Sequence, residues 1–188
     1  MNREIKKEIK FFLLPDYEKE EEYLTDMHKS GWKLKNIQWG GVYTFEKCQP
    51  ENVVYRLDFA EDKDKDMQYY IAMFDEYGWK YIQDVNDYSY FRKRTNGLAE
   101  EDTEIFSDSE SRLAMIKSII NKKLIPIWII FFGILIPNFI KVITHSFDDI
   151  PFHTVLTVIY ILLFVWYSYA LIHCRMEFLK LKKKYTKK

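Results

Sequence analysis

Two long apolar stretches dominate the pattern of hydrophobic and polar positions in the last third of the chain. The first extends over residues 124–143, and the second, over 151–173, contains no Asp, Glu, Lys or Arg. A helix needs about 20 mostly apolar residues to cross a bilayer. Two such helices can also form the core of a soluble protein, but a chain of 188 residues is too short to wrap both in protein. The pattern therefore predicts a transmembrane hairpin with its turn at 144–150.

The first hundred residues carry a second pattern, which occurs twice at a constant offset of 47 residues. In each copy, apolar residues at helical spacing end at a glycine that is followed by Trp and Lys, at residues 31–33 and 78–80. This spacing predicts helices over 16–30 and 62–77. Short apolar or alternating runs predict strands at 11–14, 42–45, 53–59 and 88–91.

In each copy, the run after Gly-Trp-Lys contains a turn or bulge signal, Gly40-Gly41 or Asn86-Asp87, which divides it into two strands. The predicted order of elements is therefore β-α-β-β, repeated once. With both helices packed on one face of an antiparallel sheet, this order describes an α+β domain, either a ferredoxin-like plait or a close variant with extra hairpin strands. We expect the domain over residues 1–94. An acidic linker over 95–108 and a juxtamembrane helix over 109–123 then lead into the first apolar stretch.

Charge is distributed unevenly along a chain that is neutral overall. From Lys117 onward there are eleven Lys and Arg against three Asp and Glu, a net charge of +8, so the preceding part carries −8. An acidic domain is unsuited to the phosphate backbone of nucleic acids, and no nucleic-acid partner is expected. The amino terminus lacks the uncharged apolar core of a secretory signal.

The positions of the basic residues predict the orientation of the hairpin. Lys and Arg lie outside both of its ends, whereas the turn holds Asp148 and Asp149 and neither Lys nor Arg. Because basic residues near transmembrane ends favour the cytoplasmic side, we expect a cell-membrane protein with both termini in the cytoplasm. The basic tail, residues 174–188, can also bind anionic lipid headgroups.

Four aromatic residues at matching positions of the two repeats form a candidate ligand site. Trp32 and Trp79 each follow a helix-ending glycine, and Tyr43 and Tyr90 lie in equivalent predicted strands. The alternative is that the tryptophans fill the core where helix meets sheet, because large aromatic residues dominate small cores. His28, on the first helix, is expected on the solvated surface.

A second candidate site lies in the predicted outer turn, where His145, Asp148, Asp149 and His153 can bind a divalent transition metal if the turn folds back on itself. The alternative is that the aspartates only reflect the orientation of the hairpin. The first helix begins with several glutamates, which oppose the positive end of the helix dipole. The sequence has neither a glycine-rich phosphate loop nor a nucleophile elbow, so no cofactor and no catalytic residue is predicted.

Several segments, in their order along residues 10–112, are similar to a bacterial family called domain of unknown function 2812. They are KFFLLPDYEKEEEYLTDMHKSGWKL, YRLDF, FDEYGWKYI, YFRKR and TEIFSDSESR. The resemblance implies a membrane-anchored protein of unestablished activity, often encoded beside regulators of the PadR type. It assigns no catalytic residues.

Together, these observations favour a non-enzymatic, two-pass membrane protein whose cytoplasmic domain senses a signal or binds an unidentified protein partner or a second copy of itself. One alternative is a membrane-surface enzyme that uses Tyr55, Arg56 and Asp58 on the central strand for acid-base chemistry. Another is an accessory subunit of a transporter.

Overall fold

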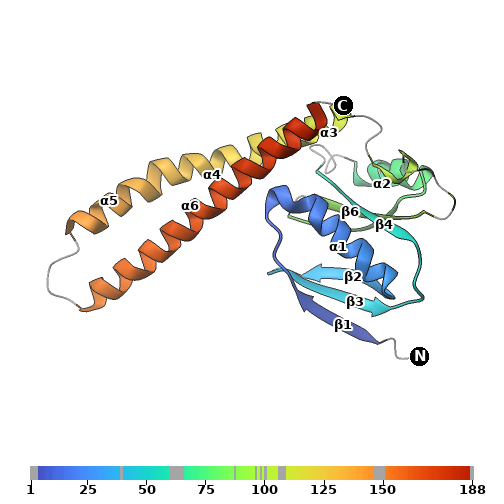
Figure 1. The fold of residues 1–188 in the computed structure, drawn as a ribbon, viewed down its shortest axis with the longest axis horizontal. Helices are drawn as coiled ribbons and strands as arrows, with labels where there is room; N and C mark the ends of the chain where they lie inside the picture. Colours follow the sequence, from blue (N-terminus) through green and yellow to red (C-terminus); the bar gives the residue numbers. More distant parts are fainter. Residues whose placement is uncertain are drawn as a thin grey trace. The chain divides into compact units, whose positions relative to one another are not determined.

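The computed structural model describes residues 4–38, 40–59, 66–86, 88–95, 97, 99, 101–105, 109–145 and 151–186 (Figure 1). The chain divides into two compact units, Met1–Met115 and Ile116–Lys187. The first unit is an α+β domain, and the second consists of apolar helices.

The duplication predicted from the sequence is confirmed in the first unit. The first repeat consists of β1 (Ile5–Ile9), α1 (Tyr17–Lys29), β2 (Trp32–Gln38) and β3 (Val42–Lys47). The second repeat consists of β4 (Val53–Asp58), α2 (Met67–Glu76), β5 (Lys80–Val85) and β6 (Tyr88–Arg94). The pairing of β2 skips Lys35 and that of β5 skips Ile82, 47 residues later, so both repeats have a bulge at the same place.

The strands of the described residues form two three-stranded antiparallel sheets, β1-β3-β2 and β4-β6-β5. This arrangement differs from the single sheet expected of a ferredoxin-like plait. Where β2 and β5 approach each other, Gln83 Nε2 donates to the Ile37 carbonyl at 3.0 Å and Gln83 Oε1 accepts from the Ile37 amide at 3.2 Å. One side-chain amide therefore occupies the backbone groups that a continuous sheet would pair.

The first strand lies earlier in the chain than predicted. It covers Ile5–Ile9, whereas the predicted strand began at Phe11, and Leu14–Asp16 forms a 3-10 turn instead. β1 is an edge strand that alternates between exposed and half-buried residues, and it is rich in charge. Charged residues protect sheet edges from unwanted pairing, so an apolar pattern does not reveal such a strand.

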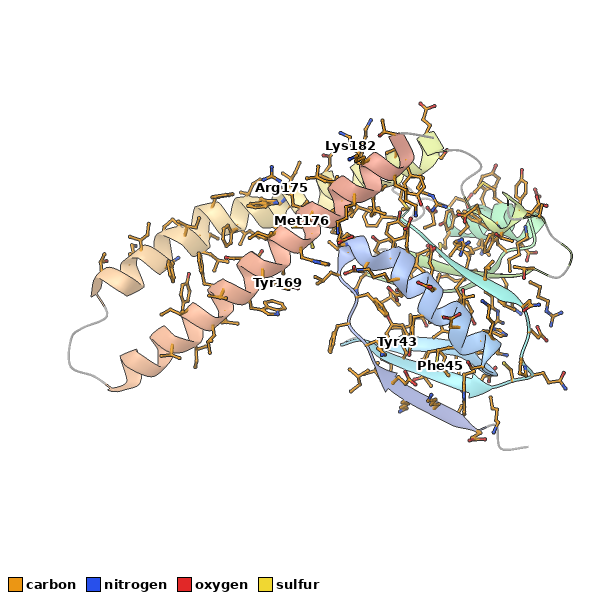
Figure 2. The ribbon with its side chains drawn as sticks, in the orientation of Figure 1. Tyr43, Phe45, Tyr169, Arg175, Met176 and Lys182 are labelled. Atoms are coloured by element: carbon orange, nitrogen blue, oxygen red, sulfur yellow. The ribbon has the colours of Figure 1, made fainter. Side chains whose placement is uncertain are left out.

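Each helix packs on the sheet of its own repeat. Leu24 of α1 is fully buried, and the ring of Tyr23 lies 5.8 Å from that of Tyr43 and 6.1 Å from that of Phe45, both on β3 (Figure 2). Gly31 and Gly78, which follow the helices, have φ values of 85° and 79°, as expected of helix-ending glycines. The core under α2 consists of Tyr70, Phe74, Trp79 and Phe91.

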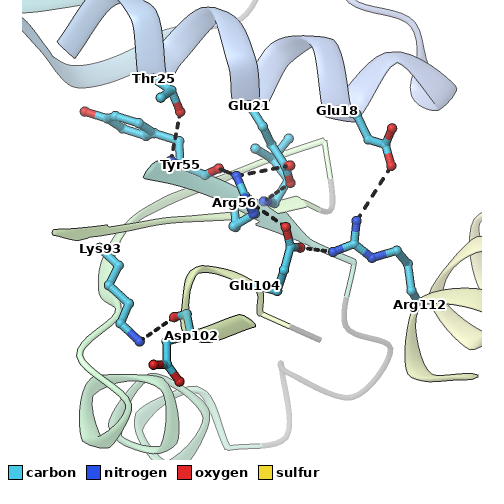
Figure 3. Close-up of polar contacts among 10 residues, drawn as sticks. Glu18, Glu21, Thr25, Tyr55, Arg56, Lys93, Asp102, Glu104 and Arg112 are labelled. Atoms are coloured by element: carbon cyan, nitrogen blue, oxygen red, sulfur yellow. Dashed lines mark hydrogen bonds and ion pairs between the residues drawn. The ribbon is translucent and has the colours of Figure 1, made fainter. Parts of the chain in front are cut away.

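α1 also covers the free edge of β4, in the other repeat. Thr25 Oγ1 accepts a hydrogen bond from the Tyr55 amide at 3.2 Å, and Glu21 Oε1 accepts one from the Leu57 amide at 2.8 Å (Figure 3). Four residues of helix rise about 6 Å, and two residues of strand extend about 6.8 Å. The two side chains therefore match the spacing of the two amides, and they join the repeats.

The second unit contains two long helical segments. The first starts with α3 (Ser109–Ile119), whose residues up to Met115 belong to the first unit, and continues through α4 (Ile125–Ile130) and α5 (Ile136–His145), with π-helical turns at Ile120–Leu124 and Phe131–Leu135. Each π-helical turn ends two residues before a proline, Pro126 or Pro137. Proline cannot donate the usual helical hydrogen bond, so the backbone is irregular at both places.

The other helix, α6 (Pro151–Thr186), extends beyond the predicted second apolar segment into the basic tail. Aromatic rings join it to the first helical segment, with Phe131 stacked 5.4 Å from Phe164, and Phe139 4.2 Å from the same ring. By length and composition, two helices of this chain are apolar enough to cross a membrane: Glu110–Lys141 and Val158–Thr186.

The contact between α1 and β4 can be tested with Thr25→Val, which keeps the shape of the side chain and removes the acceptor of the buried Tyr55 amide. We expect the free energy of opening of β4 to fall by about 1–3 kcal/mol. Amide hydrogen exchange of the full-length protein measures this change. Thr95→Val is the control, because the Thr95 hydroxyl bonds at the exposed surface, where water can replace it. Equal effects of the two substitutions would contradict the role of Thr25.

Candidate functional site

The two tryptophans of the candidate ligand site lie in different surroundings. Trp32 is half-buried at the start of β2, and the amines of Lys6 and Lys47 lie 5.6 and 5.7 Å from its ring centre. Trp79 is only 3% exposed and belongs to the core under α2, with Phe74. The structure therefore does not bring the two indole rings into one cluster of the described residues, and a role in ligand binding stays a prediction.

The two tyrosines of the candidate site do come together, on a carboxyl group that the sequence did not single out. Tyr43 and Tyr90 donate to the same oxygen of Glu20, at 2.5 and 2.6 Å. Burial raises the pKa of Glu20, although the two hydroxyl groups act in the opposite direction. Because Tyr43 is on β3 and Tyr90 on β6, Glu20 connects α1 to both sheets. The three residues also line a small pocket of about 270 Å³.

The neighbouring residue, Glu21, is also buried, because its carboxyl group faces the edge of β4. Arg56 Nη1 lies 3.8 Å from Glu21 Oε2. Burial raises the pKa of Glu21 to about 8, against the opposing effects of Arg56 and the Leu57 amide. The early glutamates of α1 were expected to oppose the helix dipole, but Glu20 and Glu21 serve as internal hydrogen-bond acceptors.

A cluster of charges fixes the start of α3 to the domain (Figure 3). Glu104 accepts from Arg56 at 2.9 Å and also contacts Arg112, whose guanidinium lies 3.6 Å from Glu18. Ile105 packs against the core under α2. Residues 101–105, which were predicted to belong to a linker, are therefore attached to the domain.

The three acid-base candidates on β4 are bound to three different parts of the domain. Tyr55 contacts α1, Arg56 binds Glu104, and Asp58 accepts a hydrogen bond from Tyr70 of α2 at 2.5 Å. These bonds hold the side chains in structural contacts. Within the described residues, they do not converge on one reacting point.

The prediction that His28 lies on the solvated surface is wrong. His28 is 3% exposed, and its Nδ1 lies 2.7 Å from the hydroxyl of Tyr55. Burial, and to a smaller extent the nearby Arg92, lower the pKa of His28 to about 4, so the imidazole is neutral at pH 7. A sequence cannot distinguish this histidine from a surface one, because its partner belongs to the other repeat.

His28 lines a pocket of about 590 Å³, which we call the basic pocket. Its lining includes five cationic side chains, those of Lys33, Lys80, Arg92, Lys93 and Arg94. Glu51 is the one carboxylate among its lining residues. Lys33 and Lys80 are the lysines of the repeated Gly-Trp-Lys motif, so this motif could have indicated the site, although no anion site was predicted from it. The net negative charge of the domain conceals it.

Cys48 also lines the basic pocket, and burial raises the pKa of its thiol. Since a thiolate is the reactive form of cysteine, these surroundings do not activate Cys48 as a nucleophile. Because His28 and the Cys48 thiol are neutral, the positive charge of the pocket comes from its lysines and arginines. This charge suits the binding of an anion.

The proposed metal ligands cannot be placed. Asp148 and Asp149, and the side chains of His145 and His153, lie outside the described residues. Elsewhere in the described part of the chain, His, Cys, Asp and Glu form no group of three that could hold a metal ion. The metal site in the turn stays a prediction.

These features define a class of protein: a duplicated β-α-β-β domain joined to two long apolar helices. A comparison with protein families finds a match over residues 16–129 to the family described as protein of unknown function (DUF2812). The chain belongs to the DUF2812 family. Comparisons of the chain with curated proteins and with solved structures find no match in either set. The matched range includes Arg112 and the beginning of the first apolar helix, so these belong to the family domain.

The raised pKa of Glu21 predicts a pH dependence of stability. An acid whose folded-state pKa of about 8 exceeds its ordinary value of 4.5 favours folding below pH 4.5, and this contribution is lost as the pH rises through 8. Thermal unfolding of the full chain should therefore occur at lower temperature at pH 9 than at pH 5. Glu21→Gln should reduce this difference, because glutamine stays neutral and still accepts from the Leu57 amide.

The control for this prediction is Glu22→Gln, which removes an exposed carboxylate from the same helix. It should leave the difference between pH 5 and pH 9 unchanged. If Glu21→Gln and Glu22→Gln had the same pH profile, Glu21 would not be the titrating group.

Proposed function

We propose that the chain is a two-pass membrane protein whose α+β domain is a cytoplasmic sensing or protein-interaction module with a regulatory, non-enzymatic role. The observation that carries the proposal is the exposure of large apolar side chains along both long helices. Ile129 is 66% exposed, and Leu162 and Val165 are 64% and 60% exposed. Apolar surface in water is unfavourable by about 25 cal/mol per Å², and lipid removes this penalty.

Polar groups within these helices support the same proposal. Tyr160 donates to the Leu135 carbonyl at 2.8 Å, and Asn138 Nδ2 donates to the Ile134 carbonyl at 2.8 Å. Polar groups in lipid require such internal partners because no water is available. Asn138 bonds within its own helix here, next to the proline that interrupts the regular hydrogen bonding.

The charge distribution supports the proposed orientation, with both termini in the cytoplasm. Most basic residues of this part of the chain lie outside the two apolar stretches, and α6 continues as a helix to Thr186, so the lysines of the tail extend from the second stretch. This arrangement favours contact of the tail with anionic lipid headgroups.

The role in interaction is supported by an apolar stripe on α2 and on Tyr77, the residue that caps its C-terminal end. Tyr69, Met73 and Tyr77 recur every four residues and are 70%, 39% and 70% exposed. Residues four apart lie on the same face of a helix. An exposed apolar stripe suits a protein partner or a second copy of the chain. The role in sensing is supported by Arg112, which attaches the domain to the helix that continues into the first apolar segment.

The membrane location predicts how charge in α6 affects fractionation. Leu162→Arg combined with Leu163→Arg should release protein from the membrane pellet after alkaline washing, because each arginine at a helix centre opposes insertion by about 2.5–3.5 kcal/mol. Met176→Arg is the matched control, since Met176 is 52% exposed on the same helix but lies beyond the apolar stretch of residues 151–173. It should stay in the pellet with the wild type.

Recovery of the wild-type chain in the supernatant without detergent would overturn the membrane location. Trypsin digestion separates location from orientation. In sealed inside-out vesicles the enzyme should remove the lysine-rich tail, whereas in intact spheroplasts it should not. The reverse result would overturn the orientation and leave the location standing.

The attachment of α3 predicts a local effect of Arg112→Gln. Loss of the contacts with Glu104 and Glu18 should speed amide exchange over residues 101–105 and the first turns of α3 by about tenfold. Lys117→Gln removes the same charge from an exposed position of α3 and should leave this exchange unchanged. Equal exchange in the two variants would remove the proposed connection between the domain and the first long helix.

A further inference from the structure

The pairing of β5 with β6 places two cations of the basic pocket directly opposite each other. Lys80 is the register partner of Arg92. Side chains opposite each other in an antiparallel pair project from the same face, about 5 Å apart at Cβ, and like charges there are destabilising. Among the described residues, neither Lys80 nor Arg92 has a carboxylate within ion-pair distance. Within the described residues, these two adjacent positive charges therefore lack a carboxylate partner, and Arg92 hydrogen-bonds instead with the side chain of Tyr55.

The other cations of the pocket are held in place by local partners. Lys33 pairs with Glu46 at 2.5 Å, and Arg94 binds Glu51 through two bonds of 2.9 and 3.2 Å. The Lys93 amine lies 5.4 Å from the ring centre of Trp79 and donates to the Asp102 carbonyl at 2.8 Å. These three cations line the same pocket as Lys80 and Arg92 and add to its positive charge.

We propose that the basic pocket binds a small molecule that carries a phosphate group, either a free solute or the headgroup of a lipid. The Arg92 guanidinium can bind two phosphate oxygens at once, and Lys80 supplies a point charge beside it. A volume of about 590 Å³ is that of a small-molecule site. The proposal goes beyond the proposed function, because the lining residues all lie within Met1–Met115 and do not depend on the membrane location.

The charge of the whole domain limits the size of the ligand. The part of the chain before Lys117 has a net charge of −8, whereas the basic pocket has five cations and one carboxylate. A long polyanion would extend beyond the pocket and be repelled by the net negative charge of the domain. A compact anion occupies only the positive region, so the arrangement selects for small ligands.

The test is isothermal titration of the full-length protein in detergent micelles with inorganic pyrophosphate. We expect saturable binding at one site, weakened about tenfold by Lys80→Gln. Arg92→Lys keeps the charge and loses the planar fork, and it should also weaken binding. The matched control is Lys35→Gln, which removes one exposed positive charge from β2 outside the pocket and should leave the affinity unchanged.

A parallel titration with vesicles separates the two sources of phosphate. Lys80-dependent binding to phosphatidic acid vesicles, with none to pyrophosphate, would assign the site to a lipid headgroup, and the reverse would assign it to a solute. Equal weakening by Lys80→Gln and Lys35→Gln, or no binding to either probe, would overturn the proposal. Thermal unfolding controls for misfolding, because Lys80→Gln removes a like-charge contact and should not lower the unfolding temperature. None of these outcomes bears on the membrane location, which the fractionation experiment tests separately.

Discussion

The fold of the domain depends on the hydrogen bonds that α1 makes with the edge of β4. A strand edge exposes unpaired amides and carbonyls, which would pair with another chain if they were left open. Thr25 and Glu21 accept hydrogen bonds from two of these amides, while Tyr23 packs against Tyr43 and Phe45 of the first repeat. α1 therefore has an apolar face for its own repeat and a polar face for the other. Its polar face keeps the two sheets separate, because it takes the place that another strand would need.

The duplication is asymmetric at the positions that make this contact. At an offset of 47 residues, Glu21 and Thr25 of α1 correspond to Gln68 and Ala72 of α2. Alanine has no acceptor for a strand amide, so α2 cannot cap a strand as α1 does. The repeats share the positions that build each half and differ where the halves meet.

Periodicity was sufficient to predict the parts of the fold that are set within one repeat. The helices, their terminal glycines and the offset of 47 residues follow from local patterns, and the structure contains them. The β1 strand was missed because an exposed edge needs no apolar face. His28, Glu20 and Glu21 were misplaced because their partners lie on other elements, and a buried polar residue looks the same in sequence as a solvated one. The basic pocket was concealed because net charge averages over a surface.

A continuous series of contacts leads from the basic pocket to the first long helix. Arg92 is the register partner of Tyr55, and the next residue, Arg56, binds Glu104, which in turn contacts Arg112 of α3. Such a series does not by itself couple the pocket to the helix. Coupling requires an element with two arrangements, and each of the two sites must favour one arrangement over the other. The Glu104 carboxylate is suited to be that element, because two guanidiniums share it. An anion that neutralised Arg92 would change the electrostatic field at Tyr55 and β4. That change would alter how Arg56 and Arg112 share Glu104, and through Arg112 it would reach α3.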